Sequence, residues 1–345
     1  MGHIVDWVSI AKKELGGKDP FEILTKPWDQ FSTLPYYKEE DLSFSVNRLT
    51  DHQSFPYGSP NHWFNLPEVD CCKPTIQSPI ILNHLQNGAD GIFFKINRDN
   101  DPEKILSDVK PEFCFLGFEC EPASIPFFEK LEGLTTVDKL NGTINWTSEP
   151  NWLSVANLFK GYEAFRCFGI NETGNSAVEQ VSNSLKKAIS VLDRLTDYAF
   201  SAQSVFNQLA FTLNSTTNFF GDVIRIRALR TLLTMLSQAY SLESSDTFIR
   251  VKINPAVGEP YQPHGDLLGN SFAAISAVAS SAHAITVTTT HKESALHQRT
   301  ARNISLLLKE ESKLDKVVDP FSGSYFIESL THSLVEKVWN QISVK

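Results

Sequence analysis

The sequence has no surplus of positive charge and no long apolar run. Its 345 residues carry 31 Lys and Arg against 40 Asp and Glu, which gives a formal net charge of −9 at pH 7. A chain without a basic excess has little to neutralise phosphates, which argues against nucleic acid or an anionic membrane as a partner. No apolar run approaches the ~18 residues that a membrane helix needs, and no signal peptide opens the chain. We therefore expect neither nucleic-acid nor membrane partners.

Cysteines are few, and the common signatures of nucleotide and metal sites are missing. The five cysteines are an odd number and include the adjacent pair Cys71-Cys72, which cannot easily bridge to each other. That usage is typical of free thiols in a reducing cytoplasm. There is no P-loop, no dinucleotide-binding glycine fingerprint and no His/Cys spacing of a metal site. Hydrophobic content of 41% and charged content of 21% describe an ordinary globular protein.

The first part of the chain predicts an arm. Trp7, Val8, Ala11 and Leu15 fall on one face of a helix that Gly16-Gly17 would end. An aromatic and proline-rich stretch with little periodicity follows, and it is too apolar for a disordered tail. We expect residues 1–66 to form an N-terminal helical and extended arm. Its aromatic residues are of the types that anchor interfaces: Trp28, Tyr36, Tyr37 and Trp63.

From about Thr75 short apolar runs alternate with amphipathic helices, of which Ser176–Leu195 is the clearest. The alternation predicts a (β/α)8 TIM barrel over residues 67–345, with an open doubly wound sheet as the alternative. The predicted strands are Gly91–Ile96, Phe113–Phe118, Thr143–Trp146, Ala164–Gly169, Leu209–Leu213, Phe248–Ile253, Ala284–Thr288 and Val317–Val318.

Barrel enzymes act at the loops that follow the carboxyl ends of the strands. The polar candidates at those positions are Glu119, Glu121, Glu172, Asn214, His264, His291 and Asp319. Each has a plainer interpretation, because loop glutamates are usually solvated and isolated histidines usually lie on the surface. Asp319 is expected to cap the turn before Pro320. The pattern contains no triad and no ligand set for a metal.

One stretch carries a family resemblance. The segments RTARN, LLLKEES and VVDPFSGSYFIESLT, between Arg299 and Thr331, resemble the end of the substrate barrel in methylmalonyl-CoA mutase and related acyl-CoA mutases. The segment ILNHLQNGADGIFFKI is most similar to the small, non-catalytic subunit of that family. The resemblance implies a substrate-type barrel and an adenosylcobalamin-dependent isomerisation of methylmalonyl-CoA and succinyl-CoA in the assembled enzyme.

The resemblance also implies that residues of the catalytic family motif are replaced in this sequence. Catalytic chains follow the fourth strand with Tyr-His-x-x-Glu-Ala-Gly, in which the His donates a hydrogen bond to the thioester carbonyl. Here Glu172 and Gly174 match that motif, but the Tyr position is Phe168 and the His position is Gly169. A glycine has no side chain with which to donate a hydrogen bond.

Other family features are missing as well. No Arg occurs between Arg98 and Arg166 to pair with a substrate carboxylate, and His62–Pro67 replaces the stretch that holds the CoA tail. The cobalt-ligand motif Asp-x-His-x-x-Gly does not occur, so the resemblance implies no C-terminal cobalamin-binding domain in this chain. We therefore expect no cofactor on this chain and adenosylcobalamin on a partner.

These observations predict a non-catalytic small (β) subunit of the mutase that supports a large catalytic subunit in a heterodimer, or that associates with itself. Two alternatives stay open. One is a catalytic acyl-CoA mutase barrel that uses cobalamin bound on a separate chain. The other is a barrel with a cofactor-free activity based on Glu119, Glu121 or His291.

Overall fold

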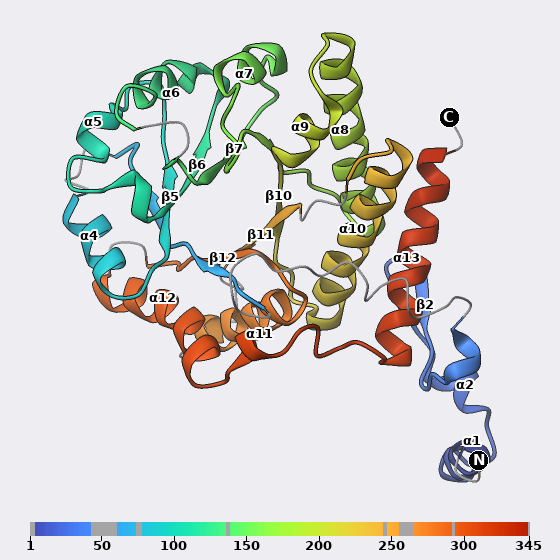
Figure 1. Cartoon of the computed structure of the whole chain (residues 1–345). Coiled ribbons are helices and arrows are strands. Elements are labelled where there is room, and N and C mark those ends of the chain that lie inside the picture. Colours follow the sequence, from blue (N-terminus) through green and yellow to red (C-terminus); the bar gives the residue numbers. More distant parts are fainter. Residues whose placement is uncertain are drawn as a thin grey trace.

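Helices and parallel strands alternate through most of the chain. The structure, a computed structural model, describes residues 4–42, 61–73, 78–135, 139–243, 247–254, 265–291 and 294–343. Figure 1 shows the helices arranged outside the strands. The parallel α/β organisation predicted from the sequence is confirmed. None of the described helices is both long enough and apolar enough to cross a membrane.

The strands form two five-stranded sheets in which every hydrogen-bonded pair is parallel. One sheet has the order β3-β12-β11-β10-β9, and the other has the order β4-β5-β6-β7-β8. Only Leu66 and Pro67 separate β3 from β4, and only Cys167 separates β8 from β9. The strands are β3 (Phe64–Asn65), β4 (Glu68–Asp70), β5 (Gly91–Lys95), β6 (Phe115–Cys120), β7 (Gly142–Trp146), β8 (Phe165–Arg166), β9 (Phe168–Ile170), β10 (Leu209–Asn214), β11 (Phe248–Ile253) and β12 (Ala284–Val287).

Amphipathic patterns become helices that bury their apolar faces. In α8 the residues at three- and four-residue spacing are buried, and the side chain of Ser176 caps the helix by accepting from the Glu179 amide. The helices of this part are α4 (Ser78–Gln86), α5 (Pro102–Ile105), α6 (Ile125–Leu131), α7 (Trp152–Leu158), α8 (Ala177–Asp197), α9 (Ala202–Asn207), α10 (Phe219–Ala239), α11 (Gly265–Ala279), α12 (Ala295–Glu310) and α13 (Tyr325–Ser343).

One predicted strand is wrong, and two short strands were not predicted. Val317 and Val318 are not a strand, and their exposed fractions are 46% and 42%. Two β-branched residues without a neighbouring strand have nothing to pair with, so they lie on the surface after the short helix η5 (Leu314–Lys316). The strands β3 and β4 were not among the predicted strands. The boundary expected after residue 66 stays a prediction, and residue 66 lies in the connection between β3 and β4.

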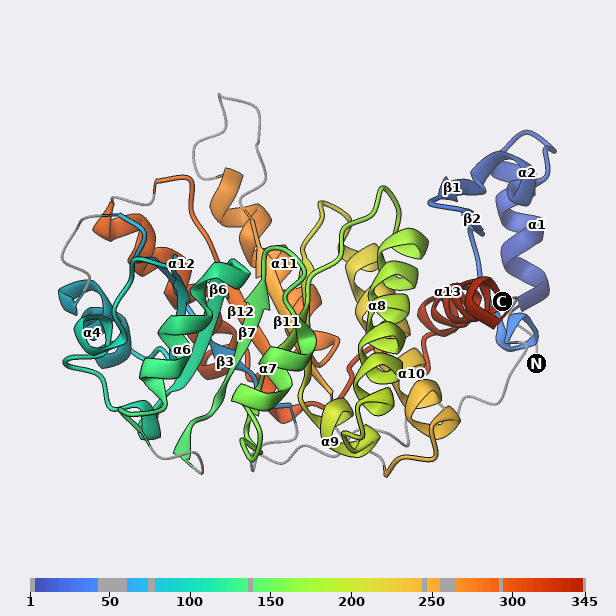
Figure 2. The ribbon, with the colours of Figure 1, turned by 90° about the horizontal axis from the view of Figure 1, so that it is seen from above.

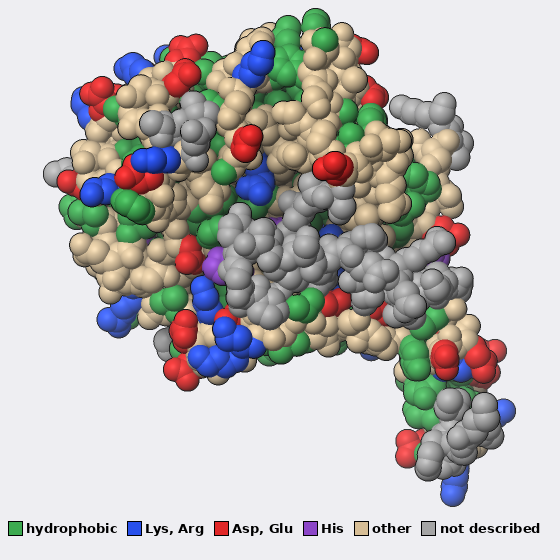
Figure 3. Space-filling view, in the orientation of Figure 1, with side chains coloured by type: hydrophobic (Ala, Val, Ile, Leu, Met, Phe, Trp, Pro, Cys, Tyr) green, Lys and Arg blue, Asp and Glu red, His purple; other side chains and the backbone are tan. Residues whose placement is uncertain are grey.

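The arm packs on the outside of the α/β part. It contains α1 (Ile4–Glu14), α2 (Pro20–Leu24) and the hairpin of β1 (Lys26–Trp28) and β2 (Phe31–Thr33). Figures 1 and 2 place it beside α13, and Figure 3 shows apolar side chains gathered where it joins the body. The ring of Tyr37 lies 5.4 Å from that of Phe326, and Lys337 donates to the Gln30 carbonyl at 3.0 Å.

One of the expected interface anchors belongs to the core. Trp63 is buried, and its indole nitrogen donates to Ser305 Oγ at 2.9 Å. Tyr36 stacks on Trp7 with ring centroids 4.9 Å apart. Part of the aromatic surface of the arm is therefore covered by its own chain.

Candidate functional site

Three charged side chains meet where the two sheets face each other. Lys252 Nζ lies 2.6 Å from Glu68 Oε2 and 3.1 Å from Glu119 Oε2. The side chains are mostly buried, with exposed fractions of 17%, 7% and 13%. Lys252 comes from β11 and the two carboxylates from β4 and β6, so the contact joins one sheet to the other. We call these three residues the ionic cluster.

Strand alternation directs these side chains inward. In β11 Ile249, Val251 and Ile253 pack into the large apolar core, whereas Phe248 belongs to a separate, inner cluster. Arg250 and Lys252 follow Phe248 at two-residue spacing and share its face. Polar and charged residues on that face therefore meet between the sheets.

The inner cluster fills the space on the amino-terminal side of the ionic cluster. We call it the apolar plug, and it consists of Leu66, Phe93, Phe115, Ala210, Phe248 and Ala284, with Phe64 packed against it. Arg250 is completely buried above the plug, with its guanidinium carbon 3.5 Å from the centre of the Phe93 ring. It donates to the hydroxyls of Thr212 and Thr286 at 3.3 and 3.1 Å. Burial lowers the pKa of Arg250 to about 10, although Glu119 and Glu68 act in the opposite direction.

The glutamates expected after the second predicted strand lie apart. Glu119 belongs to the ionic cluster, whereas Glu121 is exposed at the start of the short helix η3 (Pro122–Ser124). Asn145 is paired in register with Glu119 and shares its face. It is buried, and neither atom of its amide group has a hydrogen-bond partner among the described residues. Because Lys252 engages both Glu68 and Glu119, the cluster holds the sheets together and leaves no free carboxylate pair for acid–base chemistry.

Gly169, which the resemblance aligns with the family histidine, has no room for a side chain. A Cβ atom on Gly169 would lie 1.7 Å from the carbonyl oxygen of Ile144 and 3.1 Å from the Cα atom of Asn145. The adjacent Phe168 is buried, with its ring 6.0 Å from that of Trp152 on α7. Phe168 therefore contributes to the apolar core.

Two other predicted residues line a shared pocket. Gly174 and Asn214 border a polar cavity of about 410 Å³ between the loops after β9 and β10, which the arm also reaches through Trp28. Gly174 is required there, because a Cβ atom would lie 2.5 Å from the Gln180 amide nitrogen. The carbonyl oxygen of Glu172 accepts from Gln180 Nε2 at 3.1 Å. These contacts fix the loop that leads into α8.

The remaining candidates are peripheral or structural. His291 is exposed, with its ring centroid 4.5 Å from that of His297. His264 lies outside the described residues. Asp319 forms a buried ion pair with Arg227, which also donates to Glu328 at 2.7 Å. Asp319 thus ties α10 to the segment before α13. Among the described residues no group of three or more His, Cys, Asp or Glu side chains could hold a metal ion.

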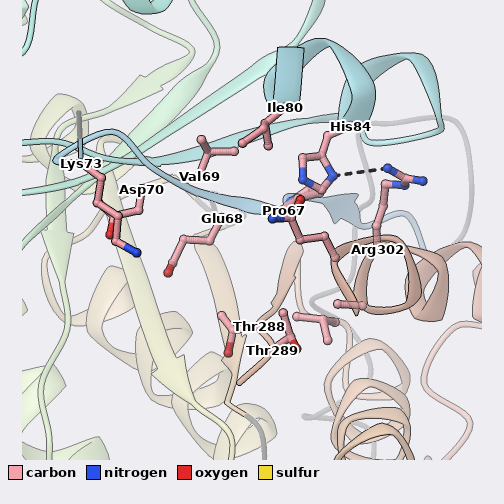
Figure 4. Close-up of a pocket in the computed structure, with 13 residues that line it drawn as sticks. Pro67, Glu68, Val69, Asp70, Lys73, Ile80, His84, Thr288, Thr289 and Arg302 are labelled. Carbon is pink, nitrogen blue, oxygen red and sulfur yellow. Dashed lines mark hydrogen bonds between the residues drawn. The ribbon is translucent and has the colours of Figure 1, made fainter. Parts of the chain in front are cut away.

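A second pocket was not anticipated from the sequence. It lies between β4 and β12 and is covered by α4 and α12 (Figure 4). His84 and Arg302 line it, and the guanidinium nitrogen Nη1 lies 3.4 Å from His84 Nδ1. Burial and the neighbouring Arg302 lower the pKa of His84 to about 4, so the ring is neutral at physiological pH. The 3–4 spacing places both residues on buried helix faces, which is the only sequence signal for them.

Comparison with known proteins identifies related chains. A family model described as methylmalonyl-CoA mutase matches residues 163–344. A methylmalonyl-CoA mutase small subunit from Porphyromonas gingivalis is 24% identical over 96% of this chain and 61% of its own length. One from Streptomyces virginiae is 23% identical over 95% of this chain and 60% of its own length. A methylmalonyl-CoA mutase from Rhizobium meliloti is 27% identical over 59% of this chain and 33% of its own. The chain thus spans about three fifths of the length of the two small subunits.

Proposed function

Because this chain belongs to the methylmalonyl-CoA mutase family, we propose that it acts as a small, non-catalytic subunit that supports a large catalytic subunit. Two relatives that match nearly the whole chain are named small subunits, which supports this role over that of a catalytic subunit. The assembled enzyme would interconvert methylmalonyl-CoA and succinyl-CoA.

The observation that carries the proposal is the lack of space at Gly169. A Cβ atom there would lie 1.7 Å from a backbone oxygen, far inside the distance that two non-bonded atoms tolerate. Even alanine would require β7 and β9 to move apart. A hydrogen-bond donor therefore cannot be placed at the family histidine position by a single substitution.

The filled interior supports the same role. The apolar plug and Arg250 occupy the space between the sheets, and a Cβ atom on Gly117 would lie 2.1 Å from the Phe93 ring. A filled interior suits a structural subunit better than a barrel that admits a long substrate. Among the residues named for a cofactor-free activity, Glu119 is held by Lys252, whereas Glu121 and His291 are exposed on separate loops.

We also propose that the two sheets close into one eight-stranded barrel. In this arrangement β3 and β4 are two parts of one strand, and so are β8 and β9. Hydrogen bonds at the first break favour it, because the Leu66 amide donates to Ile285 on one side and the Phe93 amide donates to Pro67 on the other, at 3.0 and 2.9 Å. The arm would then end before Phe64.

The cofactor is assigned to the partner. In the resembled family, the radical chemistry is supplied by adenosylcobalamin, which a domain with an Asp-x-His-x-x-Gly motif binds. That motif is absent from the present sequence. The residues of this chain would contribute by packing against the large subunit, which makes the heterodimer the functional unit in this proposal.

The test is co-expression with a methylmalonyl-CoA mutase large subunit of the same organism, followed by size-exclusion chromatography. We expect both chains to elute together. Ile23 on the arm is 50% exposed, so Ile23→Asp tests whether the arm contributes to the interface. Leu134→Asp is the matched control, because Leu134 is 41% exposed on the loop after α6. Co-elution that Ile23→Asp weakens and Leu134→Asp leaves intact assigns the arm to the interface, and separate elution of the wild-type chains overturns the subunit role.

A further inference from the structure

The pocket between β4 and β12 has the form of a small binding site. Its volume is about 100 Å³, which is less than the ~150 Å³ of a cavity that holds benzene. Among the described residues, β4 and β12 are not paired with each other, and this leaves the pocket open between them. Val69, Ile80, Val287 and Ala301 supply apolar walls. A ligand of a few heavy atoms with a short aliphatic part fits this lining.

His84 provides a hydrogen-bond donor of known direction. The guanidinium of Arg302 can only donate, so the contact of 3.4 Å requires Nδ1 of His84 to accept. The neutral ring then carries its proton on Nε2. His84 is 4% exposed and lines the pocket, and its contact with Arg302 uses Nδ1, which leaves Nε2 as the donor of the ring. Figure 4 shows this nitrogen on the side of the ring away from Arg302. A donor that lines a pocket favours an acceptor in that pocket.

Arg302 provides a charge without a counter-charge. It is 5% exposed, and its partners are the side-chain and main-chain oxygens of Asn83 and the ring of His84, all of them neutral. None of these contacts with described residues is made to a carboxylate. A buried cation with neutral partners favours a nearby anion. The contact with Nδ1 also polarises the ring and strengthens the donor at Nε2.

We propose that this pocket binds a short-chain aliphatic carboxylate, one oxygen of which accepts from His84 Nε2 while the chain lies against Val69, Ile80 and Val287. The other charged groups of the lining are Glu68, Asp70 and Lys73. Glu68 pairs at 2.6 Å with Lys252, which also pairs with Glu119, and Asp70 accepts from the Cys72 amide at 3.1 Å. This site does not depend on the role of the chain as a subunit, and it lies apart from Gly169.

The experiment uses butyrate and butyramide as probes with the full-length chain. Binding is followed by saturation-transfer NMR of the probes and by the Nε2 proton resonance of His84. We expect butyrate to bind about tenfold more tightly than butyramide, as a charge-assisted hydrogen bond predicts. His84→Phe should weaken butyrate binding about tenfold, and Arg302→Met should reduce the preference for the charged probe. His332→Phe on α13 makes the same exchange outside the pocket and should change nothing.

Two results would overturn the site. One is a wild-type chain that shows no saturable binding of butyrate and no shift of the Nε2 proton. The other is a folded His84→Phe protein, verified by its thermal melting curve, that binds butyrate as tightly as the wild type. The first result needs no variant, so a folding defect cannot obscure it. Equal binding of butyrate and butyramide contradicts the assigned role of Arg302.

Discussion

The two ends of the space between the sheets are filled by different kinds of side chain. The apolar plug fills one end with aromatic rings, among them Phe115 and Phe248 stacked with centroids 5.2 Å apart. The ionic cluster fills the other end with Lys252 between two carboxylates. Arg250 lies between them, with a ring on one side and hydroxyls on the other.

This difference determines which substitutions each end can accept without a large loss of stability. Apolar packing depends on volume, so its energy changes with the size of a side chain. A buried ionic cluster depends on balance, so removing one charge leaves the others uncompensated, whereas removing all of them can cost little. Truncating a side chain of the apolar plug should therefore lower the stability of the protein. In the ionic cluster, the removal of one charge without its partners should lower it.

The largest effect is expected in the plug. Phe115→Ala should lower the free energy of unfolding by about 4 kcal/mol, because it opens a cavity among packed rings. Phe113→Ala is the matched control, since Phe113 is 76% exposed two residues earlier and its loss should cost less than about 0.5 kcal/mol. Urea denaturation measures both. Equal losses in the two variants would mean that the plug is not close-packed.

Breaking the charge balance should come next. Lys252→Met should lower the free energy of unfolding by about 3 kcal/mol, because the buried Glu68 and Glu119 lose their ion-pair partner. Adding Glu68→Gln and Glu119→Gln should recover most of the loss. Lys187→Met breaks the more exposed pair with Glu149 and should cost about 1 kcal/mol or less. A triple variant as unstable as Lys252→Met would contradict the balance argument.

His84 should make the free energy of unfolding depend on pH, and this sets it apart from the apolar plug and the ionic cluster. The pKa of His84 is lowered to about 4 in the fold from an ordinary value of 6.5, so the unfolded chain takes up the proton first as the pH falls. Its contribution to stability is complete above pH 6.5 and is lost progressively towards pH 4. At pH 5 the loss is about 2 kcal/mol.

The comparison of wild type with His84→Phe isolates this term. The wild type should lose about 2 kcal/mol more than the variant between pH 7 and pH 5, measured by urea denaturation at each pH. Parallel pH profiles for the two proteins would show that His84 is not held neutral in the fold.

The smallest expected loss of stability comes from removing a single hydrogen bond between the arm and α8. Asp29, at φ +54° in the arm hairpin, accepts from the Val178 amide at the start of α8 at 3.1 Å. Asp29→Gly keeps the backbone conformation but removes this cap, and should cost about 1 kcal/mol. Faster hydrogen exchange of the Val178 amide measures the change. Asp29→Asn retains an acceptor oxygen and should leave the exchange rate nearly unchanged.

Elements with strong periodicity could be predicted from the sequence, and elements defined by their neighbours could not. Seven of the eight predicted strands correspond to strands of the structure. The strand material of β3 and β4 was missed, because pairs of two or three residues around Pro67 carry almost no pattern. Val317 and Val318 carry a β pattern, but they have no strand beside them.

The candidate site shows the same limit. Glu119 was predicted from its place after a strand, but its partners Glu68 and Lys252 lie far away in the sequence and meet it only through the fold. The alternation of Arg250 and Lys252 with apolar residues was the available signal for an inward-facing pair of cations. Nothing in the sequence indicated that Gly169 lies against the Ile144 carbonyl. That contact is the reason why no larger residue fits at this position.

The most direct test of the proposed role is the mutase reaction itself. The purified chain is incubated with adenosylcobalamin and methylmalonyl-CoA, alone and together with the large subunit, and succinyl-CoA is measured. We expect no turnover by the chain alone, none by Gly169→His alone, and turnover only when the large subunit is present. Conversion of methylmalonyl-CoA by this chain without the large subunit would contradict the assignment of a non-catalytic subunit.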